Sequence, residues 1–409
     1  MLQASPARDE TSPRYHGWRV VVVCFLLALF CWGFGFYGHA VYLAELQRLH
    51  GWPTGLISGA TTAYYLLSAM IAAFVSDGLA RFGPKRFVLG GIGCMTVAAL
   101  LLPEVRAPWQ LYAVYLLMAC GWAAMGLACI TSLLGFWFRE RRGMAISLAL
   151  NGASCGGVVF APLLVLLIDR IGFAPAMWIA TAAMLVVLLP AVLAWVDRPP
   201  QDLGAGAARP AGPQSVAARW TKARALRSPQ FWSVAGPFAL ALAAQVGFIV
   251  HQIAFLEPLL GRAGAGAAVA VTTTMAVVGR VGLGAVIDRL DQRITSALSF
   301  ASQAAAFLVM TQSESAPVLL AACAVFGFSV GNLITFPSLI IQREFDPAAF
   351  GLLAGLAVAV CQFAFAFGPG ALGVLRDATG SYTVPLLVCV GLDLVATIIV
   401  LIRPKAATP

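Results

Sequence analysis

One basic residue, Arg280, lies inside a long apolar stretch, where a charged side chain is costly and is usually kept for a function. Its guanidinium stays charged and presents a planar fork of donors that fits a carboxylate with two hydrogen bonds. The surrounding run, residues 265–287, predicts a helix with its midpoint near position 276, so Arg280 falls roughly 6 Å from that midpoint. Positions 276 and 284, one turn away on either side, are Ala and Gly. This favours a carboxylate from outside the chain over a buried ion pair.

Uncharged amides near the middle of other apolar runs are further candidates for binding a polar solute. Asn151 shares one predicted helix face with Ser147 and Ser154, and its amide can donate to a carboxylate or bond a hydroxyl group. A hydrogen bond between helices is the alternative role, since such bonds are common in membranes. The other candidate substrate-binding residues are Gln245, Asn332 and Gln362.

Two histidines are candidates for carrying a proton, because the imidazole changes charge near physiological pH. His39 lies roughly 10 Å from the midpoint of its predicted helix, towards the outer end, at 1.5 Å per residue. His251 lies nearer the outer end of another predicted helix. The alternative for His39 is that the ring packs as an aromatic-like residue beside Tyr37 and Tyr42. His39 is expected to carry the proton, and His251 or the substrate's own carboxyl is the next candidate. Asp393, in the middle of the last apolar run, is interpreted as a structural hydrogen-bonding residue.

The amino-acid composition indicates the class of protein in which these candidate residues lie. Of the 409 residues, 60% are hydrophobic and only 11% are charged, about half of the charged share of a typical soluble domain. A soluble protein of this size needs more polar surface. The net charge is +9, but the basic residues that produce it are not gathered on one soluble domain. This argues against nucleic-acid binding. The composition therefore excludes a soluble enzyme, a nucleic-acid-binding protein and a disordered chain.

Apolar runs of about 20 residues, the length that spans a bilayer as a helix, recur along the whole chain. They are continuous rather than alternating, so helices are predicted and not a barrel. The fold class is an all-α membrane protein with twelve transmembrane helices. The predicted spans are 18–46, 53–77, 87–105, 109–137, 141–169, 173–196, 229–258, 265–287, 294–312, 316–341, 348–375 and 382–402.

The distribution of Lys and Arg predicts the orientation, because cytoplasmic loops carry an excess of both. Placing the N-terminus inside puts 20 of the 26 Lys and Arg residues in cytoplasmic segments and five in outer loops. The protein is therefore expected in the inner (plasma) membrane with both termini in the cytoplasm. The nine cysteines lie in predicted spans without a CxxC pair, so neither a metal site nor a disulfide framework is expected.

The segment 197–228 is rich in Pro, Gly, Ala and Arg and divides the twelve spans into six and six. A short amphipathic helix is expected within it, around Arg219–Arg227. Residues of the two halves correspond at an offset of about 208: Arg81 with Arg289, Pro162 with Pro369, Asp169 with Asp377, and Gly172 with Gly380. Six-helix halves in parallel orientation are typical of Major Facilitator transporters. The predicted organisation is a cytoplasmic tail (1–17), a six-helix bundle (18–196), a cytoplasmic linker (197–228), a second six-helix bundle (229–402) and a cytoplasmic tail (403–409).

The stretch from Trp137 to Gly152, WFRERRGMAISLALNG, resembles the signature of the monocarboxylate porter family within the Major Facilitator Superfamily. Gly17-Trp18 resembles the family's other motif in reduced form. The segment Val250–Leu256 and the run Gly279-Arg280-Val281-Gly282 resemble bacterial members of that family, and the resemblance extends from about residue 17 to 402. It implies that Arg280 binds substrate. Glu140 and Asn151 depart from the usual pattern, as does Ala276, where better-known members carry an Asp.

The loop after the second span resembles a superfamily motif that locks the cytoplasmic side through charges and helix ends. The residues that match are Asp77 and Arg81 in the first half and Asp288 and Arg289 in the second, and the usual acid before the first Arg is replaced by Ala80. The resemblance implies a cytoplasmic gate. The alternative is that these Arg residues only orient the chain.

These observations together predict a secondary transporter for proton-coupled symport of small monocarboxylates such as lactate or pyruvate. One buried Arg neutralises one carboxylate, which gives the substrate class. An organic-anion antiporter without proton coupling is the first alternative, and a membrane sensor that transports nothing is the second. No enzymatic site, cofactor, metal or nucleic-acid partner is expected. The expected partners are the anion, the proton and the lipid bilayer, and the expected functional unit is a monomer.

Overall fold

The computed structural model describes residues 10–12, 14–196, 220–284, 286–333, 335–346 and 349–403. Every secondary-structure element in these ranges is helical. The elements up to residue 196 are α1 (His16–Trp32), η2 (Gly33–Tyr37), α2 (Gly38–His50), α3 (Thr54–Ala72), α4 (Val75–Phe82), α5 (Pro84–Leu101), η3 (Leu102–Glu104), α6 (Pro108–Met125), α7 (Leu127–Trp137), α8 (Arg142–Cys155), η4 (Gly156–Phe160), α9 (Ala161–Ile171) and α10 (Phe173–Trp195).

The second series of elements starts after the segment 197–219, which lies outside the described residues. A five-residue helix, α12, lies within the predicted amphipathic segment. The elements are α12 (Lys222–Leu226), α13 (Pro229–Gly284), η5 (Ile287–Arg289), α14 (Gln292–Gln312), α15 (Ala316–Leu333), α16 (Phe336–Glu344), α17 (Phe350–Thr379) and α18 (Thr383–Leu401).

Eleven helical stretches of the described chain are long and apolar enough to cross a membrane. One of them, Pro229–Leu283, has 55 residues and contains two helices joined at Gly261, whose φ of 70° is left-handed backbone that glycine adopts without strain. Counted as two, it brings the number of crossings to twelve. The predicted all-α membrane fold is therefore confirmed.

Several predicted spans are not single regular helices. The second span ends at Ala72, and a separate short helix, α4, follows it. The fourth span is divided into α6 and α7 at Gly126, whose backbone is extended. The first and fifth spans each contain a π-helical segment, η2 and η4. The hydrophobic length of a span indicates that it crosses the membrane, but it does not indicate such breaks.

The sequence repeat has a counterpart in the backbone. Gly172 ends α9 with a φ of 87°, and Gly380, its predicted equivalent, ends α17 with a φ of 71°. A left-handed residue, usually glycine, commonly follows the last turn of a helix. Pro162 lies in the first turn of α9, whereas Pro369 lies inside α17. Corresponding helices of the two halves thus both end at a glycine with positive φ, but ψ is 169° at Gly172 and −2° at Gly380, so only Gly380 has the left-handed helical conformation.

Contacts divide the chain into two compact units. Among the described residues, unit 1 holds the chain up to His39 together with residues 66–196, and unit 2 holds Ala40–Tyr65 together with residues 220–403. An ion pair between Glu45 on α2 and Arg262 on α13 is one of the contacts that tie Ala40–Tyr65 to unit 2. The predicted assignment of bundles and linker stays a prediction, since much of the linker lies outside the described ranges.

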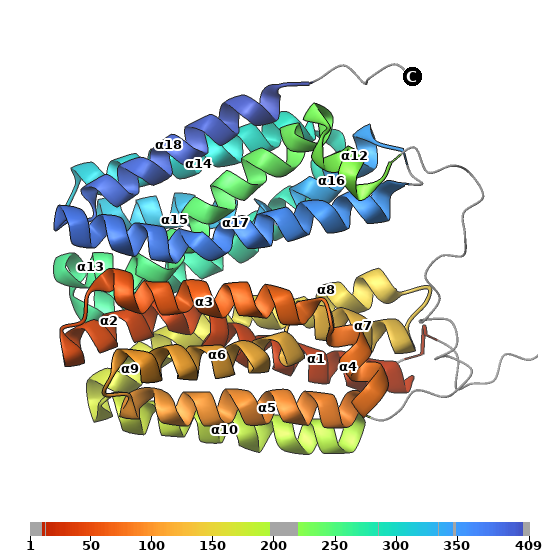
Figure 1. The fold of residues 1–409 in the computed structure, drawn as a ribbon, viewed down its shortest axis with the longest axis horizontal. Coiled ribbons are helices and arrows are strands. Elements are labelled where there is room, and N and C mark those ends of the chain that lie inside the picture. Colours follow the sequence, from red (N-terminus) through yellow and green to blue (C-terminus); the bar gives the residue numbers. More distant parts are fainter. Residues whose placement is uncertain are drawn as a thin grey trace, which may run out of the picture. The chain divides into compact units, whose positions relative to one another are not determined.

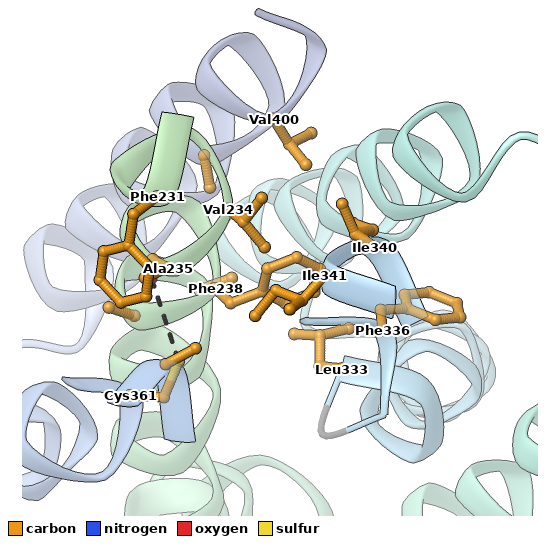
Figure 2. Packing of buried hydrophobic residues seen from close by; sticks show 14 of the residues in the cluster. Phe231, Val234, Ala235, Phe238, Leu333, Phe336, Ile340, Ile341, Cys361 and Val400 are labelled. Carbon is orange, nitrogen blue, oxygen red and sulfur yellow. Dashed lines mark hydrogen bonds between the residues drawn. The ribbon is translucent and has the colours of Figure 1, made fainter. Parts of the chain in front are cut away.

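Within each unit the helices run side by side. In unit 1, α5 lies between α6 and α10, and in unit 2, α14 lies against α18 and α13 against α17 (Figure 1). A buried apolar cluster joins α13, α16 and neighbouring helices of unit 2 around Phe231, Phe238, Phe336, Ile340 and Ile341 (Figure 2). The large phenylalanine rings fill the space between these helices and thereby fix how the helices pack against one another.

Candidate functional site

Arg280 lies in the second helix of α13, which runs from the break at Gly261 to Gly284. The midpoint of that helix is near residue 273, so Arg280 is displaced from it by seven residues, or roughly 10 Å. The sequence alone predicts a displacement of roughly 6 Å. This is a correction, because the helix both begins earlier, after Gly261 instead of at residue 265, and ends earlier, at Gly284 instead of residue 287.

Arg280 and Asn332 lie together where α13 packs against α15. The Arg280 Nε donates to the carbonyl oxygen of Gly331 at 3.1 Å, and the side chain is half-buried. Asn332 is almost fully buried, and its Nδ2 donates to the Phe328 carbonyl at 3.1 Å. A Cβ atom placed on Gly279 would lie 3.2 Å from that same Nδ2. The structure therefore brings two of the predicted binding residues to one helix contact.

Glycines set the close approach of these two helices. A Cβ atom on Gly327 would lie 2.2 Å from the Thr272 carbonyl oxygen, and one on Gly331 would lie 2.0 Å from the Ala276 carbonyl oxygen. Small residues at such contacts let the backbones of membrane helices touch. The backbone contact brings the carbonyl of Gly331 within reach of Arg280 and thereby orients the guanidinium.

We expect Gly279→Ala to destabilise the protein and Gly282→Ala to leave it unchanged or slightly more stable. A Cβ atom at position 279 would lie 2.1 Å from the Phe328 carbonyl oxygen, whereas one at position 282 would meet nothing within 4 Å. Such overpacking costs about 1–3 kcal/mol, while alanine in an open helical position gains up to about 1 kcal/mol over glycine. Thermal unfolding of both variants in detergent measures the difference. Equal shifts would contradict the close contact.

The helix that carries Asn332 is discontinuous. The sequence predicts one span over 316–341, but α15 ends at Leu333 and α16 begins at Phe336. The Asn332 carbonyl accepts from the Thr335 N–H at 3.0 Å and from its hydroxyl at 2.9 Å. Broken helices at membrane depth often form binding sites in transporters. Pro337 in the first turn of α16 is the signal that predicts this break.

Gln245 and Gln362, the other candidates in unit 2, differ in their surroundings. Gln245 is buried, and its Oε1 accepts from Gln303 Nε2 on α14 at 2.9 Å. Gln252, seven residues further along α13, donates to Thr272 at 2.8 Å. Gln362 is half-buried on α17. The amide of Gln245 thus takes part in a bond between helices, the alternative role for such residues.

In unit 1, Asn151 is exposed on α8, and it lies close in sequence to a π-helical segment. The two π-helical segments of the unit touch: the rings of Phe34 in η2 and Phe160 in η4 are 4.5 Å apart. A Cβ atom on Gly156 would lie 3.0 Å from the Gly33 nitrogen. Such π-helical turns are frequent at functional sites. The glycines within these π-helical segments are the one feature of the sequence that could have suggested them.

The two candidate histidines have different neighbours. His39 is fully buried, with its ring 4.9 Å from that of Tyr115. His251 is also fully buried, and its Nε2 lies 2.9 Å from the Pro369 carbonyl oxygen while its Nδ1 lies 3.2 Å from the Tyr382 hydroxyl. A carbonyl can only accept, so Nε2 carries a proton, and in the neutral ring Nδ1 accepts from Tyr382.

A cavity of about 390 Å³ opens where α13, α14 and α18 approach one another. Tyr382 lines it, together with Phe255, Pro258 and Glu314. Tyr382 is thus one of the residues that line the cavity, and its hydroxyl group lies within hydrogen-bonding distance of the buried imidazole of His251.

The four predicted gate residues lie on short helices. Asp77 and Arg81 are exposed on α4, and the Arg81 guanidinium lies 5.5 Å from the ring centre of Phe82. Arg289 is exposed at the end of η5. The side chain of Asp288 lies outside the described part of the structure. A locking contact between these residues stays a prediction.

Arg293 is a buried charge whose role the sequence did not indicate. It is 1% exposed and forms two bonds to Glu344, with Nε–Oε1 at 2.7 Å and Nη2–Oε2 at 2.8 Å. Its Nη1 donates to the carbonyl oxygens of Val400 at 2.7 Å and Ile402 at 2.9 Å, and its Nη2 to the Ser233 hydroxyl at 3.0 Å. One guanidinium thus joins α13, α14, α16 and the end of α18.

Comparisons with known proteins agree with this architecture. The family model described as Major Facilitator Superfamily matches residues 23–369. MFS-type transporter 1 of Ophiocordyceps sp. (strain BCC 1869) is 26% identical over 362 residues, covering 85% of this chain and 75% of its own. Monocarboxylate transporter 12 of Rattus norvegicus is 22% identical over 418 residues, covering 91% of this chain and 82% of its own.

Solved structures are similar in fold. The nucleoside transporter NupG has a TM-score of 0.73 at 12% identity, covering 94% of this chain and 97% of its own. A bacterial homologue of the human lysosomal transporter Spinster, inward-facing and occupied, has a TM-score of 0.68 at 14% identity, covering 97% of both chains. The chain belongs to the Major Facilitator Superfamily, and it is a multi-pass membrane transporter and not an enzyme.

Proposed function

We propose that this protein is a secondary active transporter that moves small monocarboxylates, such as lactate or pyruvate, together with a proton by alternating access. The observation that carries the proposal is Arg280, a half-buried guanidinium inside a membrane span, held by the Gly331 carbonyl and next to Asn332. A charge kept at this depth despite its cost is best explained by binding an anion. We place the protein in the inner membrane with both termini in the cytoplasm.

The charge at the site favours one carboxylate over two. Arg280 supplies one positive charge, and α17 carries no Lys or Arg between residues 350 and 375. A second carboxylate would therefore enter the membrane without a partner, which costs several kcal/mol or more. The signature from Trp137 to Gly152 and the similarity to a rat protein named a monocarboxylate transporter support the same substrate class.

A proton makes the transport electroneutral. An anion that moves alone into a cell opposes the membrane potential at about 2.3 kcal/mol per charge per 100 mV. Of the two candidate histidines, His251 is favoured because its neighbour Tyr382 also lines the cavity, whereas His39 packs against the ring of Tyr115. We therefore propose that His251 receives the proton through Tyr382.

We expect His251→Gln to abolish lactate accumulation driven by a pH gradient while exchange of lactate for lactate continues. Glutamine can still donate to the Pro369 carbonyl, but it cannot bind a proton in this pH range. Proteoliposomes with labelled lactate measure both activities. His39→Gln is the matched variant, and it should accumulate lactate like the parent. Loss of accumulation in His39→Gln alone would transfer the role to His39.

A further inference from the structure

Asp393 lies in the middle of α18 and is fully buried inside unit 2. The sequence predicts a hydrogen-bonding role for its carboxyl group, but neither Oδ1 nor Oδ2 has a hydrogen-bond partner within the part of the chain that the structure describes. Buried polar groups almost always have such a partner, because leaving one unbonded costs free energy. The transport site does not use this carboxyl group, so its burial needs a separate explanation.

The side of α18 that carries Asp393 faces other helices of the unit. Its buried residues recur at helical spacing and include Leu386, Cys389, Asp393, Ala396 and Val400. This helix packs against α14 and α13 (Figure 1). One turn before Asp393, the Cys389 thiol lies 3.9 Å from the Ala244 carbonyl oxygen on α13. The carboxyl group is therefore enclosed by protein and does not face the lipid.

Gln303 is the residue of α14 that lies level with Asp393. The two helices are antiparallel, because a hydrogen bond joins the start of α14 to the end of α18. Met310 of α14 and Leu386 of α18 line the same cavity. Gln303 precedes Met310 by seven residues and Asp393 follows Leu386 by seven, so each lies two turns from the cavity on the same side of its helix.

Gln303 lacks the same kind of partner as Asp393. It is fully buried, and its Oε1 has no hydrogen-bond partner among the described residues. Its Nε2 donates to Gln245 Oε1 on α13 at 2.9 Å, so that donor is already used. While the Asp393 carboxyl group is ionised, its two oxygens and Gln303 Oε1 are all acceptors, and they cannot bond to one another.

The helix segments that pack around Asp393 contain no cation. Residues 234–250 of α13 and 294–312 of α14 include no titratable side chain, and in α18 Cys389 is the only one besides Asp393. Arg293 borders this region at the start of α14, but it is paired with Glu344 at 2.7 Å. The other titratable groups that border it are His251 on α13, Tyr382 before α18, and Cys361, Arg376 and Asp377 on α17. An ionised Asp393 would thus be a buried charge without compensation, which is costly.

We propose that Asp393 is a proton-binding site, in which the carboxyl group holds a proton and donates it to Gln303 Oε1. The proton removes the buried charge and converts one acceptor oxygen into a hydroxyl donor, so it satisfies both residues at once. Together with the bond from Gln303 to Gln245, it links α18, α14 and α13 inside unit 2. This resident proton is separate from the transported proton assigned to His251, so the proposal does not depend on the proposed function.

Infrared spectroscopy of the protein in lipid, without substrate, tests whether Asp393 holds a proton. The C=O stretch of a carboxylic acid is separate from the bands of carboxylates and amides. At neutral pH, we expect the parent to show a carboxylic-acid band that is absent from Asp393→Asn. Glu104→Gln, which removes an exposed carboxyl group in η3, should leave the acid region unchanged. Identical acid regions in the parent and Asp393→Asn would overturn the proposal, as would loss of the band when sodium ions are added.

A second variant tests the partner and leaves Asp393 in place, should Asp393→Asn fold poorly. Gln303→Met removes the proposed acceptor, so we expect the Asp393 band to shift to higher wavenumber, because a hydroxyl without a hydrogen bond leaves its C=O bond stronger. Gln252→Met is the matched change at another buried amide, which donates to Thr272, and it should leave the band in place. An unmoved band in Gln303→Met would overturn the assignment of Gln303 as the acceptor.

Thermal unfolding in detergent at neutral pH gives an independent readout. Asparagine is neutral, has nearly the shape of the carboxylic acid and offers an N–H donor to Gln303 Oε1. We therefore expect Asp393→Asn to unfold at about the parent's temperature. If Asp393 were ionised in the parent, the same change would remove an uncompensated buried charge and stabilise the protein. A clearly raised unfolding temperature in Asp393→Asn would thus contradict the bound proton.

Discussion

Replacing Arg280 by Lys should reduce lactate counterflow by roughly 10- to 100-fold, the factor that corresponds to losing one charge-assisted hydrogen bond. Lysine keeps the charge but presents a single point donor instead of a planar fork. It also loses the Nε that donates to the Gly331 carbonyl, so the remaining charge is no longer oriented. The measurement is exchange of labelled for unlabelled lactate in proteoliposomes at equal pH on both sides.

The control for this loss is Arg106→Lys, the same change at an exposed position in a loop of unit 1. It should exchange lactate at the parent's rate. Thermal unfolding of Arg280→Lys should stay close to that of the parent, because lysine keeps the positive charge and the position is only half-buried. Counterflow at the parent's rate in Arg280→Lys would show that the carboxylate is bound elsewhere.

Arg293→Met should lower the free energy of unfolding by about 3 kcal/mol, the lower end of the range for breaking a buried ion pair. We expect a value at the lower end of that range because the Glu344 side chain is 31% exposed, so water can solvate its carboxylate once Arg293 is replaced. Methionine has a similar volume but leaves the carbonyls of Val400 and Ile402 without their donor. Thermal unfolding in detergent, with lactate exchange as a second readout, measures the effect.

A second ion pair near the start of α14 provides the control. Arg403 pairs with Asp291, and the Arg403 side chain is 58% exposed. Arg403→Met should therefore cost less than about 1 kcal/mol. The hydrogen bond from Arg403 lowers the pKa of Asp291, so this small stabilisation is present at neutral pH and disappears as the pH falls through the lowered pKa. Equal destabilisation by the two Met variants would contradict a special role for Arg293.

The membrane fold was predictable because it depends on a property that is local in sequence. Each span needs about 20 apolar residues, and many of the boundaries lie near a glycine, a proline or a cluster of charge. Gly172 and Gly380 end their helices as the repeat suggests. The breaks inside spans, such as that between α15 and α16, depend on packing against other helices, which hydropathy does not describe.

The contacts at the site were less predictable, because they join residues far apart in the chain. Arg280 was identified since it is a charge within an apolar run. Arg293 was not, because beside η5 it resembles any cytoplasmic arginine and its partner Glu344 lies 51 residues away. Gln245 and Asn332 are both buried amides, and only the structure shows that one bonds to α14 while the other lies beside Arg280.

The measurement that tests the central proposal most directly is uptake of labelled lactate into proteoliposomes with and without an inward proton gradient. We predict accumulation with the gradient, only exchange without it, and competition by pyruvate but not by lactamide, which lacks the carboxylate that Arg280 binds. Uptake that ignores the gradient would contradict proton coupling and support an anion antiporter. Absence of lactate uptake and exchange under all conditions would contradict the proposed substrate class.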